Sequence, residues 1–534
     1  DHVLSQNTFY NLRITSVEIN DVAEGPITMR DTTSLRTFGS MPVDEVPHGW
    51  SFQYATMWDA MYTGGEGSSG AFNFSTTRTF NVKFDFTSQV NRFNQVKFGF
   101  LVNYDDVDTF YESDVKCQPD NHWAVDWHNY PYRGGAYIQD KLEFEGMIAN
   151  LGVRVDYNNP NTGWYTTDRY SKYFTRLYRT IFSEVAPTED TESHIRVSPR
   201  IGISHPITTT SKLYFNYGHF YSMPQSNDMF AIQYDTDGIS RIGNPSLGTP
   251  RTVAYELGVE SSFGQFLVHL SGYYKDITHQ TGDVAYTNFS GTVDYSTPES
   301  NNYEDIRGFE LRVERRFGEW ITGWLNYDYM VETSGYLGRE HYYEDQRLQR
   351  IEGLQNPKQE KPLPRPVAHA HVMLTTPGDF GGQFGGFRPL ARWRLGLLFS
   401  YQAGRYQTHD PLETYELQDN LQWKDRYEFD ARISKTVRLG NRNLQIYADI
   451  NNVFNLKYLE TLGFEDTIDE RSYLNSLHLP MYSGEQYQNA GFVAGDDKPG
   501  DLKSDDKPYI DMPNRDFLSF LNPRYITFGF RIDF

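Results

Sequence analysis

Long hydrophobic runs are absent from this chain of 534 residues, and so is a second cysteine. No stretch approaches the roughly 18 consecutive apolar residues of a membrane helix, which excludes a helical membrane protein. The single cysteine, Cys117, excludes a disulfide within the chain and is expected to be incidental rather than catalytic. Positive charge is scarce too: 49 Lys and Arg oppose 70 Asp and Glu, and a net charge of −21 argues against a nucleic-acid partner.

Aromatic residues, in contrast, are plentiful. They make up 16% of the chain, although only 38% of it is hydrophobic, a low share for a large soluble protein. Disordered acidic chains are poor in aromatics, so we expect an ordered protein.

The order is expected to come from β-strands, because apolar and polar residues alternate with a period of two. In "ITFGFRIDF" at the C-terminus and in "TFNVKFDF" and "QVKFGFLV" near residue 90, every second side chain is large and apolar. Such alternation is typical of strands with unlike faces, and the four-residue link between the last two segments predicts an antiparallel hairpin. Segments of this kind are predicted to form about sixteen strands. They begin near Thr8, Thr77, Gln95, Ala136, Met147, Arg196, Ser211, Arg251, Gln265, Tyr303, Glu319, Pro366, Trp393, Tyr427, Arg442 and Pro523.

The predicted connections alternate between short turns and long loops. The long loops are expected at 21–76, 112–135, 158–195, 222–249, 281–302, 335–365, 408–426 and 459–522. One turn, "PGDFGGQFGGFRPLAR" at 377–392, is an oversized, Gly-rich member of the short class. Short turns at one end and long loops at the other are typical of an antiparallel transmembrane β-barrel of the outer membrane, with turns toward the periplasm and loops outside.

Lipid cannot hydrogen-bond a backbone, so a spanning sheet must close on itself, with one face to hydrocarbon and the other to a polar lumen. Charged residues should therefore face inward. The residues predicted to face the lumen are Glu310, Arg312, Glu314, Asn326 and Asp328. Those predicted to face lipid are Phe309, Leu311, Val313, Leu325 and Tyr327. Aromatic residues at the strand ends are expected to form girdles at the edges of the apolar band.

Several segments resemble the barrel of a TonB-dependent receptor. They are "AYIQDKLEFEGMIANLGVRVDY" (136–157), "SPRIGISHPITTTSKLYFNYGHFYSMP" (198–224), "GNPSLGTPRTVAYELGVE" (243–260), "YYKDI" (273–277), "YEDIRGFELRVERRF" (303–317) and "LQIYADINNVFNLKY" (444–458). The resemblance implies an outer-membrane receptor that imports a siderophore, vitamin, glycan or peptide with energy from the TonB complex. It also implies a barrel of 22 strands filled by an N-terminal plug.

No plug precedes the first strand of this sequence. We therefore expect residues 1–534 to be the barrel domain, with the plug and roughly six N-terminal strands outside them. The first and last strands should then pair with other strands rather than with each other, because an unpaired edge in hydrocarbon is costly. The resemblance further implies that Phe534 belongs to the signal read by the barrel-insertion machinery. The expected partners are outer-membrane lipid, the TonB complex and the ligand. A lipoprotein lid, which pairs with the glycan-importing subfamily, is a further possible partner.

Candidate ligand-binding residues lie in loops and lumen. The aromatic stretch 120–137 offers Trp123, Trp127, Tyr130 and Tyr132, which would either stack on sugar rings or pack a structured loop. Glu310, Arg312, Glu314 and Asp328 are lumen candidates. Acidic loops offer weak candidates for calcium, and solvated loops are the alternative. These acids are Asp105, Asp106 and Asp108 near residue 106, and Asp496 and Asp497 in a stretch that repeats "DDKP".

No motif predicts an enzyme or a cofactor. Nucleophile, base and orienter are not found at a usable spacing, so we expect no hydrolytic, redox or transferase activity. In "HAH", His369 and His371 share one face of a strand and are interpreted as lumen lining rather than metal ligands. Two functions remain open: active import, as the resemblance implies, and a passive porin or surface-structural barrel. A plug with a TonB-contacting motif before Asp1 would favour import, whereas a signal peptide directly before it would favour the porin.

Overall fold

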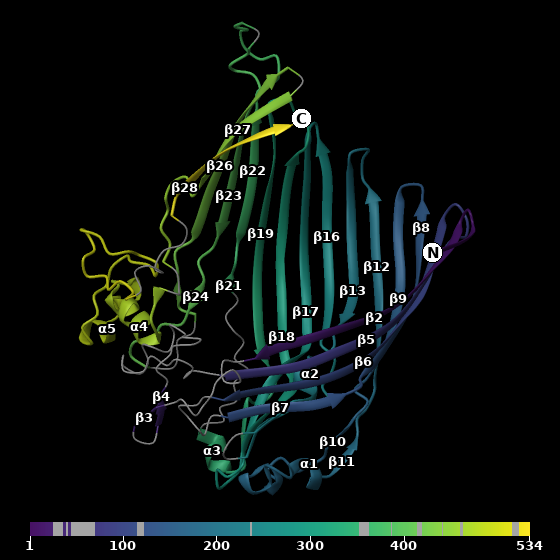
Figure 1. Ribbon diagram of the computed structural model, residues 1–534, viewed down its shortest axis with the longest axis vertical. Helices are drawn as coiled ribbons and strands as arrows, with labels where there is room; N and C mark the ends of the chain where they lie inside the picture. The colour runs from purple at the N-terminus through teal and green to yellow at the C-terminus, as the bar shows by residue number, and fades with distance from the viewer. Residues whose placement is uncertain are drawn as a thin grey trace.

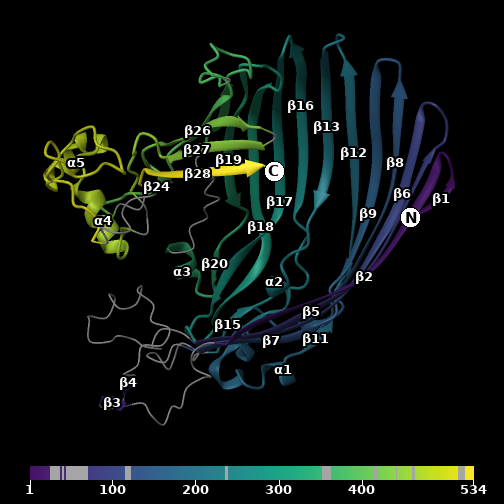
Figure 2. The same ribbon diagram turned by 45° about the horizontal axis from the view of Figure 1, so that its top comes forward.

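The computed structural model describes residues 1–24, 36–38, 41–43, 70–114, 122–234, 238–351, 363–385, 387–413, 419–440, 442–459, 463–514 and 523–533. Its main body is a strongly curved, mostly antiparallel sheet that stays open along one side (Figures 1 and 2). Among the described residues, no helix combines the length and the apolar character needed to cross a membrane.

Sixteen long strands build the wall of this sheet, one for each strand predicted from the sequence. They are β2 (Thr8–Glu24), β5 (Gly70–Gln89), β6 (Asn94–Asp114), β8 (Tyr132–Phe144), β9 (Met147–Asn159), β12 (His194–Pro206), β13 (Ser211–Tyr221), β16 (Arg251–Phe263), β17 (Phe266–Thr287), β18 (Asp294–Arg315), β19 (Ile321–Tyr336), β22 (Val367–Thr375), β23 (Trp393–Gln402), β26 (Arg426–Leu439), β27 (Arg442–Asn451) and β28 (Tyr525–Asp533). The predicted strand order and the antiparallel pairing are confirmed.

Short turns gather at one end of the wall and long connections at the other, as predicted (Figure 1). We call these the turn end and the loop end. Two-residue turns join β8 to β9 and β16 to β17, and their glycines, Gly146 and Gly264, have φ of 86° and 60°. Tight hairpin turns need such positive φ, which explains glycine at both positions.

Two of the predicted long loops are wrong in part, because strands continue into them. Instead of a loop at 281–302, β17 and β18 extend as a hairpin and leave only residues 288–293 between them. The extension is stabilised by burial of Val284, Tyr286, Val293 and Tyr295 against the neighbouring loop. Within the link predicted at 112–135, β7 (His122–Asn129) pairs with residues 107–114 of β6.

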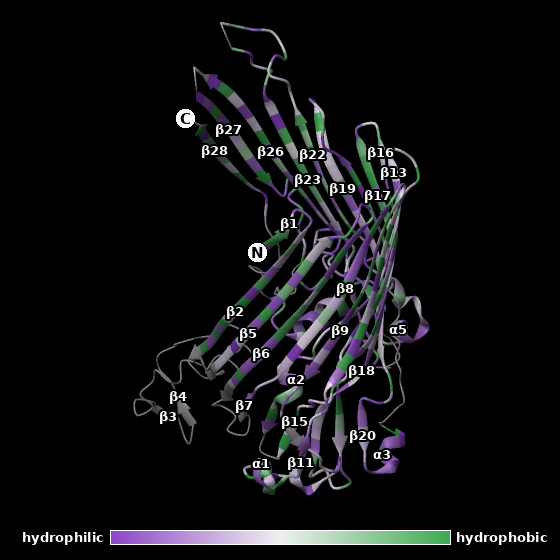
Figure 3. Cartoon of the chain, turned by 90° about the vertical axis from the view of Figure 1, so that its right-hand side faces the viewer, coloured by the Kyte–Doolittle hydropathy of each residue, from purple (hydrophilic) through white to green (hydrophobic). Residues whose placement is uncertain are grey.

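The two faces of the wall have opposite character, and hydropathy alternates along each strand (Figure 3). Glu310 pairs with Asp328 and Arg312 with Asn326 on one face, whereas Leu311 pairs with Tyr327 on the other. The predicted register of β18 and β19 is therefore confirmed. The apolar face is uncovered along the whole wall, and on β28 the side chains of Phe528 and Phe530 are 78% and 73% exposed.

Aromatic side chains line the loop-end edge of this apolar face, as the girdle prediction requires. The ring of Tyr255 on β16 lies 5.1 Å from Tyr217 and 6.2 Å from Tyr274. At the turn-end edge, β16 carries Phe263, which at roughly 3.4 Å per residue lies about 27 Å along the strand from Tyr255. Allowing for strand tilt, this spacing fits the apolar band of about 25 Å in outer-membrane barrels.

The two edges of the sheet do not pair with each other in the described residues. β2 pairs with β5 and with the short strand β1 (His2–Ser5), and β28 pairs with β27. The direct pairing that a closed sixteen-stranded barrel would need is thus missing from the described part. Phe534, with its predicted role in barrel insertion, lies outside the described residues.

The compact hydrophobic clusters all lie at the loop end, where loops pack on one another. One cluster is built from residues 421–510 and includes α4 (Thr467–Ser476) and α5 (Glu485–Asn489). The other two contain α1 (Phe182–Val185) and α2 (Ser226–Phe230). A further helix, α3 (Gln346–Ile351), follows β20 (His341–Tyr343), which pairs with β17. The remaining short strands of the main sheet are β14 (Ile232–Tyr234), β15 (Ile239–Ile242) and β21 (Leu363–Pro364).

Candidate luminal and loop sites

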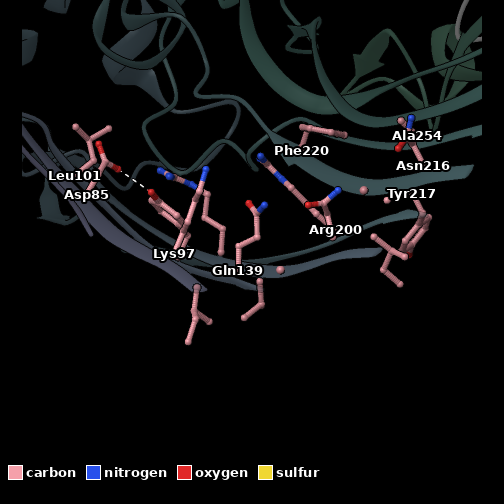
Figure 4. Close-up of a pocket in the computed structure, with 18 of the residues that line it drawn as sticks. Asp85, Lys97, Leu101, Gln139, Arg200, Asn216, Tyr217, Phe220 and Ala254 are labelled. Carbon is pink, nitrogen blue, oxygen red and sulfur yellow. Dashed lines mark hydrogen bonds between the residues drawn. The ribbon is translucent and has the colours of Figure 1, made fainter. Parts of the chain in front are cut away.

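A basic pocket lies on the concave, polar face of the wall between β5 and β16. Its volume is about 780 Å³, and its charged lining residues are Lys83, Asp85, Lys97, Arg154, Arg200 and Glu256. Figure 4 shows Lys97, Gln139 and Arg200 rising from the same side of the curved sheet. Strand alternation puts these polar groups there, because the neighbouring Phe98 and Ile138 face the opposite, apolar side.

Two cations of this pocket are not neutralised by acids. The ammonium of Lys83 lies 3.1 Å from the carboxylate of Asp85, which also accepts a hydrogen bond of 2.7 Å from the hydroxyl of Tyr137. Lys97 and Arg200, however, form no ion pair with any described carboxylate, and Arg200 rests on the ring of Phe220 at 4.7 Å. The pocket therefore presents two available positive charges to the interior.

An acidic pocket lies farther along the same face, and it brings together the four lumen residues predicted as ligand-binding candidates. Glu310, Arg312, Glu314 and Asp328 line this pocket of about 420 Å³. Glu314 is paired with Arg312 at 3.3 Å and with Arg316 at 2.8 Å. Asp328 accepts a hydrogen bond from Tyr273 at 3.1 Å, and Glu310 forms no ion pair within the described residues. The concave wall thus carries a basic and an acidic sector.

The residues of the basic pocket were not among the sequence candidates, although a signal for them existed. Lys97 stands between Val96 and Phe98, and Arg200 between Pro199 and Ile201, so alternation alone assigns both to the polar face. What alternation cannot give is their proximity, because it depends on which strands become neighbours. His369 behaves as interpreted from the sequence: it lies in this polar face and contacts the Ser400 hydroxyl at 3.0 Å.

The four aromatic candidates are not brought together. Trp127 is only 9% exposed and packs against Phe230 at 5.2 Å, in a cluster with Met229. The backbone of Trp123 pairs with Ser113, while its side chain lies outside the described part. Trp127 therefore packs a structured loop, the second of the two roles considered for it.

Tyr130 and Tyr132 lie at the outer, apolar surface. Tyr132 pairs with Tyr104 across β6 and β8, and its ring lies 5.9 Å from that of Tyr157. Tyr130 stacks on Tyr104 at 6.3 Å. These rings belong to the loop-end aromatic girdle, which was the alternative explanation for such tyrosines. Tyr132 lies six positions before Ile138, an even separation that places both on the same face of the strand, so the sequence already contained this signal.

The first acidic cluster does not form one site, because residues 104–114 are in strand β6 rather than in a loop. Asp105 accepts a hydrogen bond from Thr79 on the inner face, whereas Asp106 contacts His128 at 2.6 Å on the outer face. Asp108, two residues on from Asp106, shares the outer face. Among the described residues, no group of three or more His, Cys, Asp or Glu side chains is placed to hold a metal ion.

We call the loop-end cluster around α4 the loop cap; it comprises residues 404–413, 419–425 and 463–514. The second acidic cluster is part of an ion network within this loop cap. Asp497 is 1% exposed and accepts hydrogen bonds from the ammonium of Lys507, the amide of His478 at 2.7 Å and the hydroxyl of Tyr509 at 2.9 Å. Asp496, the other calcium candidate, is exposed. The two "DDKP" copies are thereby joined, because Asp497 comes from the first and Lys507 from the second.

The network extends to a second loop. Asp501 contacts Lys507 at 3.2 Å and also pairs with Lys424, which precedes β26. Burial alone would raise the pKa of Asp497, but the hydrogen bonds from Lys507, His478 and Tyr509 hold it below the usual range. The hydrogen bond to Asp497 in turn raises the pKa of Lys507. Nearby, burial lowers the pKa of His409, whose imidazole contacts Tyr482 at 2.7 Å, to about 4.

Comparison with known families agrees with this architecture. The family described as TonB dependent receptor-like, beta-barrel matches residues 9–453. The chain belongs to this family. TonB-dependent receptors are outer-membrane transporters rather than enzymes, and the open wall described here is their barrel fold. No curated protein matches the sequence.

Several solved structures are similar to this chain at low sequence identity. The copper transporter OprC is 11% identical, with a TM-score of 0.50 over 86% of this chain and 59% of its own. FpvA of P. aeruginosa, solved with heterologous pyoverdines, is 12% identical, with a TM-score of 0.49 over 86% of this chain and 51% of its own. The ferric-catecholate import receptor Fiu of E. coli K12 is 11% identical, with a TM-score of 0.46 over 85% and 59%. The chain therefore spans just over half the length of these structures.

Proposed function

We propose that this chain is the transport barrel of an outer-membrane receptor that imports an extracellular nutrient ligand with energy delivered through TonB. The observation that carries the proposal is the family match over residues 9–453. The ligand class is a siderophore, vitamin, glycan or peptide. The partners are outer-membrane lipid, the TonB complex acting through a plug, and the ligand itself, with a lipoprotein lid as a further candidate.

The distribution of polar and structured regions supports this function. The concave wall carries the basic and acidic pockets, which suit a polar plug and a polar solute better than a bare water channel. In the parts of the long connections that the structure describes, side chains form packed hydrophobic clusters. In the proposed orientation the loop end faces outside and the turn end faces the periplasm.

A passive porin is the second candidate. A sixteen-stranded porin needs β2 and β28 to pair directly, and their described partners are other strands. The proposal therefore treats residues 1–534 as a barrel domain that is completed by further strands and a plug.

Uptake by cells separates the two functions. Cells that produce the intact protein would be offered labelled ferric siderophores, cobalamin, oligosaccharides and peptides, with TonB present or deleted. We expect one class to accumulate against its gradient, and deletion of TonB to abolish accumulation while surface binding persists. Uptake that merely equilibrates and ignores TonB would contradict active import and favour the porin.

A further inference from the structure

The oversized turn between β22 and β23 carries several exposed apolar side chains at the turn end. Residues 376–392 carry Phe380, Phe384, Phe387 and Leu390, whose side chains are 39%, 72%, 45% and 55% exposed. A soluble surface rarely gathers so many exposed large apolar groups in one short segment, and such a patch marks an interaction site. Figure 1 shows this turn projecting beyond the neighbouring turns.

Hydrogen bonds within the turn form a backbone frame that carries its exposed apolar side chains. Phe384 and Phe387 exchange backbone hydrogen bonds of 2.8 and 2.9 Å. The guanidinium of Arg388 donates to the carbonyls of Asp379 and Gly381 at 2.7 and 2.9 Å. At the base, the ring of Trp320 packs edge-on against Phe380 at 4.8 Å.

A lysine of the barrel wall fixes this frame to the outer face. Lys435 on β26 pairs with Trp393 in the register of the apolar side. Its ammonium donates to the carbonyl of Ala391 and, at 3.1 and 3.0 Å, to those of Arg388 and Pro389. The turn is therefore continuous with the lipid-facing surface.

The depth of the turn follows from the cost of charge in lipid. A lysine on the lipid face costs roughly 2–4 kcal/mol at the midplane but about 0–1 kcal/mol near the interface. Lys435 lies at the end of the wall, with its ammonium 5.4 Å from the ring of Phe387 and 5.6 Å from that of Trp393. Aromatic rings beside a cation that reaches toward polar groups are typical of the headgroup region of a bilayer.

The charges of the turn suit anionic headgroups. Arg388, Arg392 and Lys435 form no ion pair with any carboxylate in the described part of the chain, and Asp379 is the single acid between Thr376 and Arg392. This local excess of positive charge contrasts with the net charge of −21 for the whole protein. Basic residues at a membrane surface attract anionic lipid.

We propose that residues 376–392 form a lipid-binding wedge: Phe384, Phe387 and Leu390 insert into the leaflet at the turn end, and Arg392 contacts the phosphate of an anionic phospholipid there. The wedge anchors the barrel rim in the membrane. It requires a membrane barrel but not any particular cargo, so it stands or falls separately from the proposed import.

Site-directed spin labelling tests the insertion. In the intact protein with Cys117→Ser, Phe384→Cys would be labelled with a nitroxide and reconstituted in vesicles of phosphatidylethanolamine and phosphatidylglycerol. We expect the label to collide readily with oxygen and poorly with a water-soluble nickel chelate. Glu145→Cys, in the exposed two-residue turn at the same end, is the matched control and should show the reverse. Equal access of the nickel chelate to both labels would overturn the insertion.

A second experiment tests the headgroup contact. Native mass spectrometry would count phosphatidylglycerol and phosphatidylethanolamine retained by the intact protein and by its Arg392→Gln variant. We expect the variant to lose phosphatidylglycerol affinity about fivefold, the effect of one basic residue at an anionic surface, and to keep phosphatidylethanolamine unchanged. Unchanged retention of both lipids in a variant that still migrates as a folded barrel would overturn the contact.

Discussion

The two ends of the barrel each hold a lysine ammonium in a hydrogen-bonded position, but they satisfy its charge differently. At the loop end, Lys507 is held by the carboxylates of Asp497 and Asp501 in a cap with its own hydrophobic core. At the turn end, Lys435 is held by backbone carbonyls beside aromatic rings. In the proposed arrangement, a cap surrounded by water supplies full countercharges from within, whereas a turn at the membrane interface leaves cations available for lipid. The ends thus differ because their solvents differ.

The largest expected effect concerns the wall that separates the two ends. Leu325→Arg puts a charge on the apolar face and should destabilise the folded barrel by about 2–4 kcal/mol. Asn326→Arg, one residue on and on the polar face, should change stability by less than about 1 kcal/mol. Urea unfolding of the protein in lipid vesicles measures both. Equal destabilisation by the two substitutions would refute the assignment of the faces.

Breaking the ion network of the loop cap should have the next largest effect. Asp497→Asn leaves the ammonium of Lys507 with Asp501 alone, and we expect the cap to lose about 2 kcal/mol, below the cost of breaking a fully buried pair because the side chain of Lys507 is 32% exposed. Faster proteolysis within residues 463–514, with the strands intact, is the measured result. The adjacent Asp496→Asn changes an exposed side chain and is the matched control. Similar cleavage of the two variants would show that the network does not hold the cap.

Acid should loosen the loop cap through His409. Burial lowers the pKa of His409 from its ordinary value of 6.5 to about 4 in the folded state. The unfolded cap therefore binds more protons between these values, so stability is complete above pH 6.5 and falls as the pH drops toward 4. We expect a loss of at most about 2 kcal/mol, measured by amide exchange of the cap at pH 7 and pH 5. His409→Gln, which retains a partner for Tyr482, should flatten this dependence; an unchanged profile would exclude His409 as its source.

The smallest expected effect is at the turn end. Lys435→Met removes one ammonium from three carbonyls that lie near the interface, so we expect a loss of about 1 kcal/mol in urea unfolding. Lys97→Met, in the polar wall, removes a cation without an ion pair and should change stability by less than about 0.5 kcal/mol. If Lys435→Met lowered stability as much as Asp497→Asn does, the proposed contrast between the two ends would be wrong.

The wall was predictable from the sequence because its physical cause is local. Each strand must show lipid one face and the lumen the other, so alternation located all sixteen strands and assigned Glu310 and Asp328 to the same, polar face. The same counting rule, applied to Tyr132, would have assigned it to the outer girdle. The rule was not enough for the short strand β7, which is held by its pairing with β6.

The loop sites were harder to predict because they depend on contacts between distant segments. From the sequence, Asp497 is interpreted as a solvated acid; in the structure, Lys507 and Tyr509 donate hydrogen bonds to it. The sequence leaves the role of Trp127 open; in the structure, its ring packs against Phe230. Nothing periodic marks such contacts, because they depend on which distant segments meet. The repeat of "DDKP" was the one local signal that two segments of the cap belong together.

The orientation of the two ends is the claim on which the proposed transport depends, and cysteine labelling tests it most directly. In a Cys117→Ser background, Asp496→Cys in the loop cap and Glu145→Cys at the turn end would be exposed to a membrane-impermeant maleimide on whole cells. The account predicts labelling of position 496 on intact cells and of position 145 only after the outer membrane is permeabilised. Labelling of position 145 on intact cells, with position 496 protected, would contradict it.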